Sequence, residues 1–248
     1  MFALSITEMH LFMVTIIVPA YNEQRNLEEL IPFLSSSKTN ASLEIIIALS
    51  PNNTDRSESI SINNGARFLK CTMRGRAAQM NEDASSAKGD ILVFLHADVK
   101  PPESFLMDIQ HTIDEGYEAG FFSCRFDKES FFLKINASFT SKEGIFTRGG
   151  DQCLFIEKEV FEKLGAFNEE QMLMEDFEFF DRMKKNKVRY KIIKNDLIVS
   201  ARKYKYNSYV RVNLSNMFLV VLYKFGYPPY KLKSLHNRLL SVPYQKNS

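Results

Sequence analysis

Short apolar runs rich in β-branched residues alternate with polar stretches of helical composition through the first half of this chain. Runs that are apolar at successive positions predict strands buried on both faces, because helices cover both faces of a parallel sheet. The alternation predicts βαβ units, and therefore an α/β fold with a mainly parallel central sheet and helices on both faces. The predicted strands are residues 14–18, 44–49, 67–71 and 91–95, and the predicted helices lie near residues 23–34, 56–64 and 76–87.

The second half of the chain has a less regular pattern. It contains no internal repeat, low-complexity tract or linker rich in proline and glycine, so we expect one compact domain over residues 14–225. An N-terminal extension, residues 1–13, precedes this domain, and a basic and aromatic tail, residues 226–248, follows it. The predicted strands are residues 119–126, 151–156, 188–193 and 197–201, and the predicted helices are residues 130–146, 157–164, 174–186 and 206–225.

Composition argues against several classes of protein. The 32 Lys and Arg residues oppose 30 Asp and Glu residues, and a net charge of +2 gives no support for binding nucleic acid through bulk charge. The three cysteines are far apart and lack a C-x-x-C spacing, so neither a disulfide framework nor a structural zinc site is predicted. The opening residues lack the basic region of a signal peptide, and no apolar run reaches 18 residues, so we expect a cytoplasmic protein.

Ligands of an open α/β sheet bind beyond the carboxyl ends of its strands, so the polar residues that follow each strand are candidates for a site. Neither a G-x-G-x-x-G nor a G-x-x-x-x-G-K-[ST] sequence follows the first strand, which removes the main support for a dinucleotide site or a P-loop. The segments found instead, in chain order, are IIVPAYNE, GRAAQMN, GDILVFLHAD, GDQ and MEDFEFFDR.

These five segments together resemble those of family 2 glycosyltransferases, and they are most similar to the bacterial radical-SAM/selenodomain-associated subgroup. The resemblance covers roughly residues 14–225. It implies a GT-A fold and the inverting transfer of a sugar from a nucleotide-sugar donor to an acceptor. It also implies a divalent cation, Mg²⁺ or Mn²⁺, as cofactor.

The resemblance implies that Asp98 is the metal ligand. In the family a D-x-D triplet after the fourth strand holds the cation, and here the triplet is His96-Ala97-Asp98, which keeps one carboxylate. A cation at this point balances the negative charge that develops on the leaving diphosphate. His96 is a candidate for contact with the ribose or with the metal. A structural role for Asp98, capping the turn before Pro101, remains an alternative.

The resemblance also implies contacts to the donor from several loops. Glu23, after the first strand, is placed to accept a hydrogen bond from the ribose or base, although a glutamate here also favours the helix dipole. Ser50 stands where the family has a base-binding carboxylate. A hydroxyl accepts a hydrogen bond less strongly than a carboxylate, so the identity of the base stays open. The same nucleotide-sugar site includes Pro19, Tyr21, Asn22 and Asn52.

Three further residues complete the expected donor site. Arg76 and Gln79 open a helix three residues apart, and therefore on one face, and a helix N-terminus favours an anion. Arg202 resembles a late basic residue of the family, and a guanidinium can contact phosphate through two hydrogen bonds. Ordinary helix packing and a solvated strand end are the structural alternatives.

Inverting transfer requires a base that takes the proton of the acceptor hydroxyl. The resemblance implies that Asp176 is this base, with Glu175 beside it. The apolar residues 172–174 before the pair could desolvate one carboxylate and raise its pKa. Two carboxylates at a helix start also have a structural explanation, because they favour the helix dipole. The residues implied to face the acceptor are Arg148, Asp151 and Gln152.

The end of the chain, residues 203–246, interleaves Lys and Arg with Tyr, Leu and Phe. Such a stretch can lie on an anionic membrane surface, which would place the protein at the inner face of a membrane near a lipid-linked acceptor. Apolar residues spaced in this way are more often core or a contact between copies in a homo-oligomer. Two other functions stay open: a non-catalytic nucleotide-sugar-binding protein, and a nucleotidyltransferase, whose Gly-rich loop after the first strand is absent here.

Overall fold

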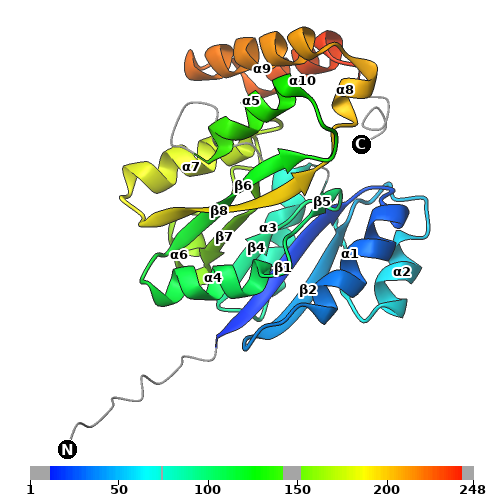
Figure 1. The fold of residues 1–248 in the computed structure, drawn as a ribbon, viewed down its shortest axis with the longest axis vertical. Coiled ribbons are helices and arrows are strands. Elements are labelled where there is room, and N and C mark those ends of the chain that lie inside the picture. The colour runs from blue at the N-terminus through cyan, green and yellow to red at the C-terminus, as the bar shows by residue number, and fades with distance from the viewer. Residues whose placement is uncertain (1–11, 74, 142–151, 242–248) are drawn as a thin grey trace, which may run out of the picture.

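The computed structural model describes residues 12–73, 75–141 and 152–241 (Figure 1). Its strands are β1 Met13–Ala20, β2 Ser42–Leu49, β3 Arg67–Lys70, β4 Ile91–Phe94, β5 Val99–Lys100, β6 Ala119–Phe126, β7 Leu154–Glu157 and β8 Tyr190–Val199. They form one sheet in the order β3-β2-β1-β4-β7-β6-β8-β5. Strands β1 to β4 pair in parallel, as do β6 and β8, whereas β7 and β5 run antiparallel to their neighbours. The predicted α/β fold with a mainly parallel sheet is therefore confirmed.

Helices cover both faces of this sheet, as the doubly apolar strands require. Successive side chains of a strand point to opposite faces, and β1 shows this at Ile16 and Ile17. Ile16 lies in one hydrophobic cluster with Leu27 and Phe105, and Ile17 lies in the other with Met80 and Phe179. The helices that supply these side chains and their neighbours are α1 Gln24–Ser36, α2 Ser57–Asn63, α3 Arg76–Ser86, α4 Phe105–Asp114, α6 Lys158–Lys163 and α7 Glu175–Lys185.

Two of the predicted strands, residues 188–193 and 197–201, are wrong as separate elements, because they form the single strand β8. The polar residues between them interrupt the apolar pattern without ending the strand. β8 bulges there: Phe122 pairs with Ile193, but Cys124 pairs with Leu197. In this bulge the Asp196 carboxylate accepts a hydrogen bond from Ser123 Oγ of β6 at 2.5 Å.

The helix predicted over residues 206–225 corresponds to α9 Tyr209–Lys224, and a short helix, α8 Lys203–Tyr206, precedes it. Ser208 breaks the run, because its hydroxyl accepts a hydrogen bond from the backbone of Arg211 and so caps the start of α9. The tail contains a further helix, α10 Pro229–Leu239, that the sequence did not predict. Helix α10 packs against α9, and Asn207 exchanges two hydrogen bonds with the backbone of Ser241. The expected boundary at residue 226 thus separates two helices that are in contact.

Helices α9 and α10 lie side by side at one end of the molecule, with α5 Phe131–Thr140 between them and the sheet (Figure 1). Asn136 of α5 donates a hydrogen bond to Asn213 and accepts one from the Tyr209 hydroxyl, both on α9. Among the described residues, no helix is long and apolar enough to cross a membrane. Below, α8, α9 and α10 are called the outer helices.

Candidate active site

The loops that follow β1, β2 and β4 carry most of the predicted site residues. Parallel pairing joins Ala20 to Leu49 and Ile17 to Phe94, so these loops emerge at the same edge of the sheet. Three segments distant in the sequence reach this edge as well: the start of α3, the start of α7 and the residues before α8. Side-chain contacts join these loops and segments at the sheet edge.

Arg76, the first residue of α3, joins three of the predicted site residues. Its Nε donates a hydrogen bond to Glu175 Oε1, and its Nη2 lies 3.0 Å from Asp176 Oδ2. Its Nη1 lies 3.2 Å from Nε2 of His96. The helix start therefore directs its cation at the two carboxylates of α7, and this cluster unites residues 76, 96, 175 and 176.

Glu175 is buried, with 3% of its side chain exposed. Burial raises the pKa of this carboxyl, but the Arg76 charge and its hydrogen bond outweigh burial and hold the pKa below its ordinary value. The expectation that an apolar approach raises the pKa of one carboxylate is therefore wrong for Glu175. Asp176 is more accessible, with 20% of its side chain exposed. Of the two neighbours, Asp176 is the one that a ligand can reach.

A second cluster joins the loop after β1, the loop after β4 and the segment before α8. Arg202 Nη2 lies 3.0 Å from Asp98 Oδ2 and 3.3 Å from Glu23 Oε1. Glu23 Oε2 also accepts a hydrogen bond from Asn26 of α1. The guanidinium thus bridges the two carboxylates that the resemblance assigns to the metal and to the donor.

The carboxylates of these two clusters are the candidate ligands for a cation. No group of three or more His, Cys, Asp or Glu side chains is arranged to hold a metal in the parts of the chain that the structure describes. Mg²⁺ is commonly held by one or two carboxylates together with substrate phosphates and water, so the half-buried Asp98 carboxylate fits such a cation when a diphosphate is present. Arg202 lies where a phosphate oxygen bound to that cation could also accept its hydrogen bonds.

The loops after β1 and β2 are held together by their own polar side chains. Asn22 adopts a left-handed backbone, with φ of 53°, and its Oδ1 accepts hydrogen bonds from the backbone of Thr54 at 2.8 Å and of Asp55 at 3.3 Å. Asp55 accepts in turn from the backbone of Gln24 at 2.9 Å. These contacts give Asn22 a structural role that the sequence did not indicate.

The other predicted donor contacts lie around the same edge. Ser50 is buried directly after β2, and its Oγ lies 3.5 Å from the backbone nitrogen of Asn52. Pro19 is half-buried within β1, and Tyr21 is half-buried in the following loop. Gln79, by contrast, is buried on α3 with 8% of its surface exposed. Gln79 is therefore packed within the fold rather than presented to solvent beside Arg76.

Of the expected acceptor residues, Arg148 and Asp151 lie outside the described residues. Gln152 is buried, and its amide nitrogen donates hydrogen bonds to the carbonyl oxygens of Phe122 at 3.1 Å and Thr140 at 2.9 Å. These bonds tie the start of β7 to β6 and α5. The Gln152 Oε1 atom has no hydrogen-bond partner among the described residues.

Lys233, on α10, is a residue near the site that the sequence analysis missed. Burial lowers its pKa, the Arg76 cation lowers it further, and the Glu175 carboxylate opposes them. These influences place the Lys233 ammonium within electrostatic reach of the Arg76 cluster. The sequence carried no signal for this position, because the helix that presents it was not predicted.

The comparisons with known proteins show the family and the fold of the chain. The family model described as Glycosyl transferase family 2 matches residues 15–159. The matched segment contains the Arg76, Asp98 and Glu23 positions, and ends before α7. None of the curated proteins compared with the chain matches it.

Solved glycosyltransferases superpose on most of the chain. A mannosyltransferase from Pyrobaculum calidifontis, in complex with GDP-Man and Mn²⁺, has a TM-score of 0.64 at 20% identity, over 92% of this chain and 69% of that one. Glucosyl-3-phosphoglycerate synthase from Mycobacterium tuberculosis, in complex with Mn²⁺ and UDP, has a TM-score of 0.60 at 16% identity, over 88% and 81%. S. aureus TarS 1–349 has a TM-score of 0.62 at 16% identity, over 85% of this chain and 65% of that one. At these identities the likeness establishes the GT-A fold.

Proposed function

Because the chain belongs to glycosyl transferase family 2, we propose that this glycosyltransferase moves a sugar from a nucleotide-sugar donor to an acceptor hydroxyl with inversion at the anomeric carbon. The observation that carries the proposal is the Arg76 cluster. It holds two adjacent carboxylates, Glu175 and Asp176, beside the loops that follow β1 and β4. A protein that only binds a nucleotide sugar needs no such pair.

In this proposal Asp176 is the general base and Glu175 is a positioning residue. Asp176 keeps part of its surface accessible, so an acceptor hydroxyl can reach it, whereas Glu175 is buried against Arg76. The Arg76 cation pairs with both carboxylates and holds the pKa of Glu175 below its ordinary value. A base so placed contributes typically ~10²–10⁴-fold to the rate.

The donor site lies between the two arginine clusters. Glu23, His96 and Arg202 are proposed to contact the nucleotide sugar, with Ser50 at the base. Asp98 is proposed to hold Mg²⁺ or Mn²⁺, and a bound cation supplies positive charge against the diphosphate as it leaves. The described solved structures contain GDP-Man, UDP and Mn²⁺, which supports this assignment by analogy. Secondary contacts are proposed for Pro19, Tyr21, Asn22, Asn52 and Arg76, whereas Gln79 is buried within the fold and is left out.

The acceptor side carries proposals that rest on the sequence resemblance. Arg148 and Asp151 are proposed to face the acceptor, which is lipid-linked in this proposal and met at the inner face of a membrane. Gln152 is buried and bonded to Phe122 and Thr140, so it is left out of this contact. The assignment to the radical-SAM/selenodomain-associated subgroup has the same basis. Association into a homo-oligomer is the alternative use of the apolar C-terminal surface.

The test begins with a donor. Nucleotide sugars with uridine or guanosine are screened by thermal shift with and without Mn²⁺, because a ligand that binds only the native state raises its stability. With a working donor and acceptor, Asp176→Asn should lower transfer by roughly 10²–10⁴ while donor affinity stays within a few-fold. The near-isosteric amide keeps an oxygen for Arg76 but cannot take the proton.

Asp181→Asn is the matched control, since Asp181 lies on the same helix and pairs with Lys224 instead. It should transfer sugar at the parent rate. Parental transfer by Asp176→Asn would make Glu175 or Asp151 the candidate base. Complete loss of donor binding would assign Asp176 to the nucleotide or metal site. Donor binding without transfer to any acceptor would favour the non-catalytic alternative.

A further inference from the structure

Helix α9 exposes an apolar face that no described part of the chain covers. At about 100° per residue, six large apolar side chains fall within an arc of about 100° on this face. The opposite side of α9 is also apolar, and it packs inward through Val212 and Leu219. A helix that is apolar on two sides is typical of burial on both. The outer face consists of Val210, Leu214, Met217, Phe218, Val221 and Phe225, which are between 45% and 85% exposed.

The charges around this face have one sign. The last acidic residue of the sequence is Asp196, and residues 202–248 contain nine Lys and Arg. Among the described residues of this segment, Arg202 and Lys224 form ion pairs with acidic side chains. Five others have no such partner within the described residues, namely Lys203, Lys205, Arg211, Lys231 and Arg238. The outer helices therefore carry an uncompensated positive charge.

The cations border the apolar face. By the same count of about 100° per residue, Arg211 lies at one border of the face and Lys224 at the other. Tyr227 and Tyr230 follow the helix, partly exposed, and the Lys231 ammonium lies 5.9 Å from the centre of each ring. An apolar surface bordered by tyrosine and lysine is typical of helices that lie in the interface of a bilayer.

We propose that the outer face of α9, with the cations that border it, docks on the surface of an anionic lipid bilayer. The apolar side chains enter the boundary between headgroups and acyl chains, and the cations meet the lipid phosphates. With 16 residues, α9 is about 24 Å long, which is shorter than the ~30 Å hydrocarbon layer, so it lies along the surface. A second copy of the chain fits this face less well, because it would bring the same positive charge against it.

The docking surface and the candidate site are connected through the C-terminal segment of the chain that begins at Arg202. Arg202, which contacts Glu23 and Asp98, directly precedes α8, and Lys233 of α10 lies within electrostatic reach of the Arg76 cluster. Docking would therefore present the site to an acceptor held in the bilayer. That last step rests on the proposed function, whereas the binding of lipid does not.

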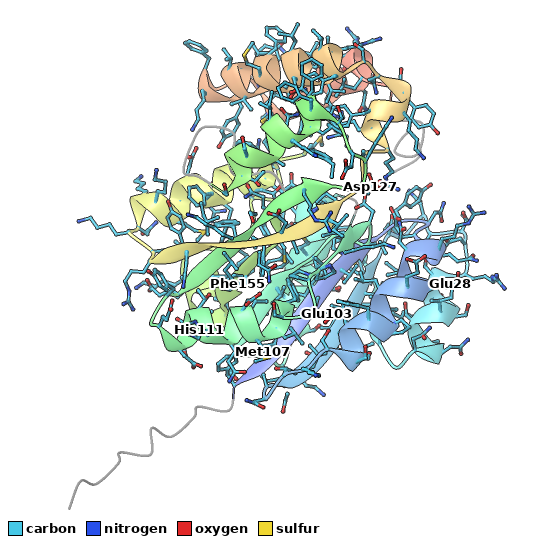
Figure 2. The ribbon with its side chains drawn as sticks, viewed as in Figure 1. Glu28, Glu103, Met107, His111, Asp127 and Phe155 are labelled. Carbon is cyan, nitrogen blue, oxygen red and sulfur yellow. The ribbon has the colours of Figure 1, made fainter. Side chains whose placement is uncertain are left out.

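The test measures binding of the full-length protein to vesicles by co-sedimentation, without donor or metal. We expect binding to vesicles of phosphatidylcholine mixed with phosphatidylglycerol, weak binding to phosphatidylcholine alone, and loss of binding as salt rises. The variant Leu214→Gln/Phe218→Gln should bind at least tenfold more weakly. Met107→Gln is the matched control, because Met107 is 52% exposed on α4, away from the outer helices (Figure 2), and it should bind as the parent does.

A second pair of variants tests the charges. Lys205→Glu/Lys231→Glu should weaken binding to the anionic vesicles by about tenfold or more, since each cation near such a surface contributes severalfold. Lys163→Glu, at an exposed position on α6, should bind like the parent. The proposal is overturned if the parent does not bind anionic vesicles, or if the apolar and charge variants both bind like the parent. It is also overturned if light scattering finds a dimer that Leu214→Gln/Phe218→Gln dissociates, which would assign the face to a second copy.

Discussion

Arg202 lies between Asp98 and Glu23, where it contacts one oxygen of each carboxylate. A divalent cation at Asp98 would compete with this guanidinium for the Asp98 charge, and a diphosphate would give Arg202 new acceptors. Metal and nucleotide are therefore expected to bind together more tightly than either alone. The arginine keeps the acidic residues paired when no ligand is present.

At the residue scale this arrangement leads to a prediction for Asp98. Asp98→Asn should remove the Mn²⁺-dependent part of the affinity for a nucleoside diphosphate, because an amide oxygen is neutral and a much weaker ligand for a hard cation. Calorimetry with UDP and with GDP, each with and without Mn²⁺, measures this. Asp90→Asn, just before the opposite end of the same strand, is the control. An unchanged Mn²⁺-dependent affinity would remove Asp98 from the metal site.

Asp83 gives a second prediction at this scale. It is fully buried on α3, and neither carboxylate oxygen has a hydrogen-bond partner among the described residues. Burial raises its pKa to about 7, Glu82 adds to the rise, and Arg67 opposes it. The unfolded chain loses this proton near its ordinary pKa of 3.8, but the native chain keeps it until about 7. Between these values the native state binds more protons, so the free energy of unfolding falls as pH rises, by at most ~1.4 kcal/mol per unit.

Asp83→Asn removes that dependence, because the amide stays neutral. We expect the variant to be more stable than the parent at about pH 8 and to lose most of this advantage at about pH 4. Urea denaturation at both pH values measures the difference. The exposed Asp114→Asn on α4 is the control and should follow the parent. Equal slopes of stability against pH in the parent and Asp83→Asn would contradict the assignment.

At the scale of elements, β6 depends on one glycine. Gly120 pairs with Phe155 of β7 on one side and with Lys191 of β8 on the other. A Cβ atom on Gly120 would overlap the ring of Phe155 and would lie 2.8 Å from the carbonyl oxygen of Lys191. Phe155 lies within the sheet, fully buried (Figure 2), so its ring has little room to move.

Gly120→Ala should therefore lower the free energy of unfolding by ~3 kcal/mol, as overpacking in a filled core does. Chemical denaturation measures the loss. The double variant Gly120→Ala/Phe155→Leu separates the two contacts, because a smaller side chain relieves the clash with the ring. If it is more stable than Gly120→Ala, the ring is the obstacle. A loss under ~0.5 kcal/mol in Gly120→Ala would show that the strands separate without strain.

At the scale of the whole molecule, the candidate site is assembled from both ends of the chain. Glu23 comes from the first loop of the sheet, Arg202 directly precedes α8, and Lys233 comes from α10. The family match covers residues 15–159, so it includes the sheet edge but not α7 or the outer helices. The exposed face of α9 therefore lies outside the segment that the family model matches.

The order of strands and helices up to β4 followed from the sequence, because strands buried on both faces keep a continuous apolar pattern. The short strand β5 and helix α4, which come next, were not predicted. The polar residues after β1 and β4 identified the site edge, because strand ends in a parallel sheet share one side. The two carboxylates at the start of α7 were identified through the family resemblance. The sequence pattern did not predict the elements whose structure depends on tertiary contacts. In the bulge, Asp196 accepts a hydrogen bond from Ser123 of β6, and the local sequence of β8 does not indicate that bond.

The sequence by itself determined which residue types stand at the edge of the sheet, and the resemblance in its motifs indicated the family. Only the tertiary structure decided which of those charged residues form ion pairs with one another. Arg76 turns to Glu175 and Asp176, 99 and 100 positions away, and this cation lowers a pKa that burial alone would raise. Helix α9 is apolar on two sides, and only its packing shows which side is left exposed. The periodicity of apolar and charged residues indicates which residues share a face of a helix or strand. It does not indicate which residue, distant in the sequence, packs against that face or pairs with its charges.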